Sequence, residues 1–413
     1  ATAVGKGAAD ALTGASSPNG VGTVAIGKDA MGVAVNQSYC TAVGWSSLDS
    51  ATSGNNNTAL GANSLGATVD GSENTAVGGA ALAADCVANN AAVGYGALQS
   101  FTGSSATAIG AYAADAATSA TYLTAVGLNA LGALTEGLQC TAVGADALAA
   151  VTTGDFNTAV GQVAGQYTTG GSNTFLGCTT GTFATTAEHC VAVGRNALVG
   201  ASTGSPATGN YNIAVGNYAL DAVTDGIDNI GVGHQALSAV TGGDYNTAIG
   251  STAGFNTTGS NNNFMGFQAG YFSTSADDCV AIGRAALRGD GSTPPSGNYN
   301  IAIGSYSLDA TTSGHSNVAI GHNAGTAIID GDANVLIGRA AGYGLNAENN
   351  TVAIGYAALS AETSSSGNVA IGYLALEDQN VASANNVAVG FSAGLNLTSG
   401  TDSVYVGYLA GGV

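Results

Sequence analysis

The segment Asn74-Thr-Ala-Val-Gly-Gly-Ala-Ala-Leu82 decides the fold, because close variants of it recur along the whole chain. Asn246-Thr-Ala-Ile-Gly-Ser-Thr-Ala-Gly254 is a later copy. The central block occurs 24 times, and the glycine that ends each block follows the previous one after 16 to 18 residues, apart from three gaps of 21 or 22. Self-similarity at a short, fixed period is typical of a solenoid, in which each repeat forms one coil.

Aligning the copies on this repeat glycine, counted as position 0, divides the sequence into columns. Position −1 is Val, Ile, Leu or Met in all 24 copies, position −2 is Ala in 19, and position −3 is β-branched in all but two. Asn occupies position −4 in 14 copies, and position +4 is Leu in 13 and Gly in 8. A short β-branched run that ends in Gly indicates a strand followed by a turn.

Each predicted strand buries too little to be stable alone, so identical neighbours must stack about 4.8 Å apart in a parallel ladder. We therefore predict an all-β fold, a parallel β-solenoid of about 24 coils with 17 residues per coil. It should occupy residues 1–413 as a single continuous repeat domain. At that spacing the coils would extend over roughly 115 Å.

Alternation along the strand places positions −3 and −1 on one face and the Ala of position −2 on the other. We expect the Ala face to point outward and to need a close partner, either another wall of the coil or another chain. The Asn column should form a hydrogen-bonded ladder. The repeat glycines are expected to be structural turn residues, and seven represent them: Gly44, Gly78, Gly144, Gly161, Gly250, Gly321 and Gly372.

The three long gaps contain extra residues that must leave the ladder. They follow Gly5, Gly194 and Gly283, and all four prolines lie within them: Pro18, Pro206, Pro294 and Pro295. Proline cannot donate to a strand ladder, so these insertions are predicted to be surface loops and a possible second contact surface.

Charge excludes several classes of partner. The chain has 6 basic and 26 acidic residues, for a net charge of −20. So few bases cannot neutralise a nucleic-acid backbone or form a polybasic membrane patch. We therefore expect no nucleic-acid binding. No apolar run reaches the length of a spanning helix, so membrane insertion is not expected either. No zinc site is expected, because the six cysteines lack any C-x-x-C pair or companion histidines. No other metal site and no cofactor are expected.

Catalysis finds little support. The four histidines lie in separate coils: His189, His234, His315 and His322. A hydrolase would need a pair of acids on one exposed column, and the sequence identifies none. Calcium in the loops stays open, although the Gly-Gly-x-Gly-x-Asp pattern is missing. A flat Thr column could bind ice, but Val replaces Thr in many copies, which favours packing.

The cysteines follow the repeat. Four of them, Cys40, Cys140, Cys190 and Cys279, occupy the Asn column and are expected to be free, partly buried thiols. They lie too far apart along the axis to pair within one chain. Cys178 and Cys190 would pair only if their columns adjoin.

Position +1 is the most informative column for binding, because its side chains are long, charged or aromatic. It holds five of the six bases, and it also holds the candidate surface-contact residues Trp45, Tyr95, Phe267, Tyr356, Tyr373, Phe391 and Tyr408. Aromatic rings on a rigid ladder are suited to stacking on sugars or to gripping a receptor. Packing between chains is the alternative.

The pattern Asn-Thr-Ala-Val-Gly-x-x-Ala-Leu resembles the head repeats of trimeric autotransporter adhesins, and more closely the related 17-residue repeats of bacteriophage tail fibres and bacterial surface fibres. The resemblance extends from Thr2-Ala-Val-Gly5 to Val404-Tyr-Val-Gly407. It implies a left-handed β-roll, a homotrimer and a role in attachment.

We therefore expect a non-enzymatic structural or attachment fibre: a viral (phage) tail fibre or appendage shaft that mediates or spaces adhesion to a host surface. The alternative is a bacterial extracellular adhesin or a self-assembling surface filament. Either would be extracellular or on the virion surface. The expected partners are the chain itself, as a homotrimer or end to end because neither end has a cap, and a host cell-surface receptor or glycan.

Overall fold

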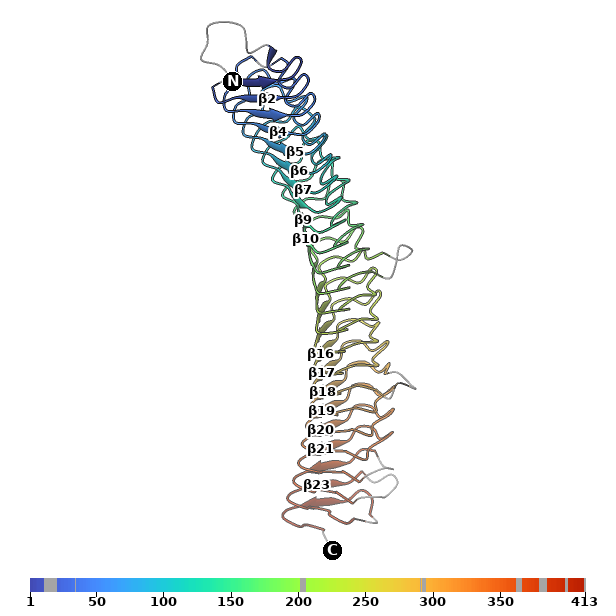
Figure 1. The fold of residues 1–413 in the computed structure, drawn as a ribbon. Coiled ribbons are helices and arrows are strands. Elements are labelled where there is room, and N and C mark those ends of the chain that lie inside the picture. Colours follow the sequence, from blue (N-terminus) through green and yellow to red (C-terminus); the bar gives the residue numbers. More distant parts are fainter. Residues whose placement is uncertain are drawn as a thin grey trace. The chain divides into compact units, whose positions relative to one another are not determined.

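The computed structural model describes residues 1–10, 21–33, 35–200, 206–289, 291, 295–361, 366–378, 385–397 and 400–411. These residues form two compact units, Ala1–Thr208 and Gly209–Val413, which we describe one at a time. Pro18 and Pro294 lie outside the described residues. Within each unit the coils stack one on the next with their strands along one side (Figure 1). The predicted all-β, parallel β-solenoid with coils of about 17 residues is confirmed, with 24 strands in the described residues.

Twelve three-residue strands lie in each unit, one at each copy of the repeat. The first unit contains β1 (Thr2–Val4), β2 (Val24–Ile26), β3 (Thr41–Val43), β4 (Thr58–Leu60), β5 (Thr75–Val77), β6 (Ala91–Val93), β7 (Thr107–Ile109), β8 (Thr124–Val126), β9 (Thr141–Val143), β10 (Thr158–Val160), β11 (Thr174–Leu176) and β12 (Val191–Val193). The second contains β13 (Ile213–Val215), β14 (Ile230–Val232), β15 (Thr247–Ile249), β16 (Asn263–Met265), β17 (Val280–Ile282), β18 (Ile301–Ile303), β19 (Val318–Ile320), β20 (Val335–Ile337), β21 (Val352–Ile354), β22 (Val369–Ile371), β23 (Val387–Val389) and β24 (Val404–Val406).

Neighbouring strands pair in parallel with every column in register. Between β8 and β9, for example, Thr124 pairs with Thr141 and Ala125 with Ala142. Positions that share a column in the sequence therefore share a row of contacts in space. The insertion between Gly283 and Gly304 leaves this register intact, since β17 still pairs with β18 column for column.

The Ala face does not point outward, but one of the two partners predicted for it, another wall of the same coil, is confirmed. The Ala of position −2 is fully buried, as at Ala125 and Ala142, whereas the residues on either side of it are half-buried or exposed. The opposite wall of the coil explains this arrangement. It contributes buried Ala and Leu from positions +3 and +4, such as Ala147 and Leu148, which leave room for only a small residue opposite. Positions −3 and −1 therefore form the outer surface of the sheet, which we call the strand face.

The alternation of Leu and Gly at position +4 follows from the volume of the core. Four copies replace the strand Ala with a larger residue, namely Phe175, Phe264, Leu336 and Tyr405. The eight glycines at position +4 belong to those four coils and to the coil before each: Gly165, Gly181, Gly254, Gly270, Gly325, Gly342, Gly394 and Gly411. A Cβ on Gly165 would lie 2.8 Å from the Phe175 ring. One large strand side chain thus occupies the space of two leucines, as close packing requires.

A buried ladder of asparagines joins the coils, as the sequence predicts. Asn157 Nδ2 donates to the carbonyl oxygen of Gly170 in the next coil at 2.9 Å, and Asn157 Oδ1 accepts from the backbone N–H of Asn173 at 3.0 Å. Both groups of each amide are therefore satisfied inside the core, which avoids the large penalty for burying an unpaired polar group.

Cysteines replace asparagine in this ladder and make one of the same contacts. Cys140 Sγ donates to the Gly154 carbonyl oxygen at 3.1 Å, where an asparagine amide would donate. All six cysteines are free thiols, and only Cys178 is exposed. Burial raises the pKa of the Cys140 thiol and raises that of Cys279 to about 11.

These burial and pKa differences predict selective thiol chemistry. Because the thiolate is the reactive form, iodoacetamide at mildly alkaline pH should modify only Cys178 in the folded protein. In denaturant all six cysteines should react. Intact-mass spectrometry counts the added groups, and peptide mapping identifies them. Rapid labelling of Cys140 or Cys279 in the folded chain would contradict their burial.

The repeat glycines adopt a backbone conformation that other residues avoid. The seven named above have φ angles between +133° and +143°. At Gly161 a Cβ would also collide with the carbonyl oxygen of Gly177 in the next coil. The turn therefore needs glycine for two independent reasons.

Candidate contact surfaces

The seven aromatic residues proposed from position +1 all lie on the surface. Their exposed fractions run from 42% for Tyr356 to 74% for Tyr408. They differ in what surrounds them. Trp45 and Phe267 each stand alone in their part of the column, Tyr95 meets Tyr112 edge-on at 5.5 Å, and the other four follow one another in consecutive coils.

Those four residues form a stacked ladder in the second unit. The ring centroids of Tyr356 and Tyr373 are 5.1 Å apart, those of Tyr373 and Phe391 4.9 Å, and those of Phe391 and Tyr408 5.4 Å, with interplanar angles of 10° to 23°. The Arg339 guanidinium lies 5.6 Å from the Tyr356 ring. The faces of Tyr373 and Phe391 are therefore covered by neighbouring rings, and only ring edges face solvent. A sugar ring cannot stack on these two residues.

The strand face is the second surface, and it is regular over both units. Neither position −3 nor position −1 holds a charged residue in any of the 24 copies. In the first unit position −3 is Thr in nine of the 12 strands, so hydroxyl and aliphatic columns run side by side. In the second unit both positions are aliphatic in ten of the 12 strands, as at Val352 and Ile354. Val352 and Ile354 are half-buried, and others of this face, such as Ile371 and Val404, are exposed.

A third surface, missed in the sequence, lies at positions −8 to −5, where the chain approaches the Asn ladder. We call it the loop groove. Among the described residues, three cavities lie on it or at its edge, two in the first unit and one in the second. The largest, about 400 Å³, is lined by Thr153, Gly154, Asp155, Phe156, Thr169, Gly171, Ser172, Glu188 and His189.

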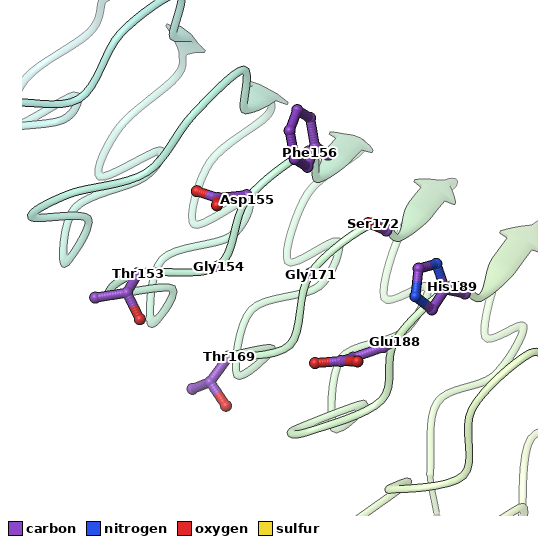
Figure 2. A pocket seen from close by; sticks show the side chains of 9 residues that line it. All are labelled: Thr153, Gly154, Asp155, Phe156, Thr169, Gly171, Ser172, Glu188 and His189. Carbon is purple, nitrogen blue, oxygen red and sulfur yellow. The ribbon is translucent and has the colours of Figure 1, made fainter.

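Figure 2 shows how the side chains of this cavity are arranged. Phe156, Ser172 and His189 follow one another along the side next to the strands, and Thr153 and Thr169 lie on the opposite side. Thr153 and Asp155 come from one coil, Gly171 from the next and Glu188 from the one after, so the cavity extends over three coils.

Asp155 and Glu188 both stand at position −6, two coils apart, and both line this cavity. Asp155 Oδ1 accepts the backbone N–H of Leu138 at 2.8 Å. Asp244 and Asp332 make the same contact with the preceding coil, to Ile227 and His315. Position −6 is thus a second polar ladder, in which a carboxylate joins one coil to another.

The second unit contains a matching cavity of about 380 Å³, lined by Ser296, Gly297, Asn298, Tyr299, Ser313, His315 and Ser316. His315 Nε2 lies 3.3 Å from Asp332 Oδ2, so an acid again borders the groove. The third cavity, of about 210 Å³, includes Asp70 and Asp85. Hydrogen bonds from Ser53 and Thr52 lower the pKa of Asp70, which keeps this carboxyl ionised.

The sequence did contain a signal for the groove. An aromatic residue immediately precedes the Asn column in six copies: Tyr39, Tyr122, Phe156, Tyr211, Tyr245 and Tyr299. All six are more than half exposed and have φ angles between +56° and +62°. The positive φ is a property of the column and not of these six residues, since Ser172, His189 and Asp228 share it.

The described residues contain no group of three or more His, Cys, Asp or Glu side chains that could hold a metal ion. Among the same residues no helix is long and apolar enough to cross a bilayer. His234 and His322 meet Tyr218 and Tyr306 edge-on at 6.4 and 6.3 Å, which is a packing arrangement. Comparison of the sequence with protein-family models and with curated proteins found no match.

Proposed function

We propose that the chain is a non-enzymatic fibre protein whose copies associate through the strand face and which mediates or spaces attachment to a cell surface. The strand face of the second unit supports this proposal. It presents two columns over twelve strands, a length of roughly 50 Å, and both columns are aliphatic in ten of these strands. Soluble monomers rarely expose an apolar patch of this extent, and such patches mark association sites.

The repeat resemblance makes the assembly more specific. It favours three chains around one axis, because three strand faces can then enclose a common apolar core. A phage tail fibre or appendage shaft is the preferred setting, on the virion surface. A bacterial extracellular adhesin or self-assembling filament would use the same face. The resemblance also implies the left-handed winding, which stays a prediction.

Mass in solution tests the association. Light scattering coupled to size exclusion should give three times the chain mass of 39.6 kDa. The double variant Val352→Glu/Ile354→Glu places two charges on the strand face and should dissociate the oligomer, since burying unpaired charges there is strongly unfavourable. Tyr356→Glu, in the same coil but at position +1, is the matched control and should leave the mass unchanged. A monomeric wild type would overturn the proposal.

A further inference from the structure

The loop groove repeats its shape along the solenoid. Its cavities around Phe156 and Tyr299 hold about 400 and 380 Å³, and each extends over more than one coil at the same column positions. Volumes of this size are typical of ligand sites. A groove built from the same columns in successive coils suits a ligand that is itself a linear repeat.

The floor of the groove is rigid before any ligand binds. Position −7 is glycine in both cavities, at Gly154 and Gly297, and both glycines are buried against the carbonyl oxygen of the next coil. The Asn ladder supports this floor from below. Asn300 Nδ2, for example, donates to the Gly314 carbonyl oxygen at 2.7 Å. A site that is already ordered loses little conformational entropy on binding, which favours affinity.

The rim next to the strands offers open aromatic faces. Phe156 and Tyr299 are 52% and 60% exposed, and neither ring stacks on another ring of the described residues. In the ladder of Tyr356, Tyr373, Phe391 and Tyr408, by contrast, each ring stacks on a neighbouring ring. An exposed ring face is where the C–H groups of a pyranose can pack.

The remaining side chains of both linings are polar, and those of the Phe156 cavity include two acids. Ser172 and Glu188 line one cavity, and Asn298, Ser313 and His315 line the other, so donors and acceptors for hydroxyl groups are present in both. The carboxylates of Asp155, Glu188 and Asp332 repel a polyanion, as does the net charge of −20. Few apolar side chains are available to anchor a peptide.

We propose that the loop groove of each unit binds an extended, uncharged polysaccharide that lies along the coils of that unit, with a sugar face on Phe156 in the first unit or on Tyr299 in the second, and with sugar hydroxyls on the polar side chains between the rims. One coil advances by about 4.8 Å. A ligand that lies along the groove therefore passes from the ring of Phe156 to Ser172 and His189 in the next two coils, or from Tyr299 to Ser316. This inference rests on the proposed attachment role, for which it names the ligand, but it uses a different surface from the strand face.

Affinity electrophoresis of the full chain tests the proposal. Native gels would contain hydroxyethylcellulose or galactomannan as uncharged polymers, or alginate as the anionic one. The test variant is Phe156→Ser/Tyr299→Ser, which the backbone tolerates because Ser172 and Ser316 occupy the same column at φ +62° and +60°. Tyr373→Ser is the matched control, since serine also occurs at position +1, in Ser251 and Ser305. Circular dichroism checks that each variant is folded.

We expect at least one uncharged polymer to retard the wild type and the Tyr373→Ser control, without sensitivity to added salt. Loss of each ring should weaken retardation roughly two- to tenfold. Retardation by neither uncharged polymer, retardation by alginate alone, or an unaltered double variant would overturn the proposal. The measurements distinguish a failure of the fibre proposal from a failure of the groove proposal. A monomer that is still retarded contradicts the fibre alone, and an oligomer that is not retarded contradicts the groove alone.

Discussion

Replacing Gly161 by Val should destabilise the first unit by about 4 kcal/mol or more, because two penalties coincide. The φ angle of +140° lies in a region that is sterically unfavourable for every residue except glycine. A Cβ would also collide with the Gly177 carbonyl oxygen of the next coil. Relief of the collision requires that the two coils separate, which breaks the hydrogen bonds of the ladder on that side. Denaturant unfolding followed by circular dichroism measures the change.

Gly79 provides the matched control for that substitution. It occupies position +1, has no positive φ, and a Cβ there would meet only the movable ring of Tyr95 at 3.3 Å. Gly79→Val should therefore change stability by less than about 0.5 kcal/mol, the usual range for a surface substitution. Equal losses at Gly79 and Gly161 would show that the turn assignment is wrong. The same reasoning applies to Gly144, whose φ angle is +138°.

The strands and their register were predictable from the columns, whereas the direction of each face was not. Alternation shows that the residues flanking Ala125 share a face, but it carries no information on which face is inside. That depends on the width of the coil, which the opposite wall sets through residues such as Ala147 and Leu148. A small residue in a strand is therefore as compatible with a narrow interior as with a close partner outside.

For the candidate sites too, the sequence predicted which residues share a column but not how their side chains are arranged. Column +1 predicted exposed aromatic residues, and Trp45 and Tyr373 are exposed. The sequence did not reveal that consecutive rings cover each other's faces, because this depends on the spacing of the coils. The loop groove was missed because Phe156 and Tyr299 stand in a column of mixed composition. The aromatic residues of that column are visible in the sequence, but only the structure shows that they border cavities.

The core around Phe175 provides the second large effect and a direct test of the volume rule. Phe175 is fully buried, and Gly165 and Gly181 lie against its ring. Phe175→Ala alone should cost about 3–5 kcal/mol, since it removes a large apolar side chain and leaves a cavity. Gly181→Leu alone should also destabilise, by about 1–3 kcal/mol, because the new side chain has no room beside the ring.

In the Phe175→Ala background, the two glycine-to-leucine changes should increase the free energy of unfolding instead of lowering it. The triple variant Phe175→Ala/Gly165→Leu/Gly181→Leu reproduces the Ala and two-Leu arrangement of ordinary coils, in which Leu148 and Leu198 adopt φ +50° at the same position. It should recover most of the lost stability, ending within about 1.5 kcal/mol of the wild type, as volume-conserving changes do. Residues that share a cavity show coupling energies of about 0.5–3 kcal/mol, so a thermodynamic cycle over the three positions must be strongly non-additive. If urea unfolding instead gave additive losses of stability for the three changes, packing volume would not explain the eight glycines at position +4 or the alternation of Leu and Gly there.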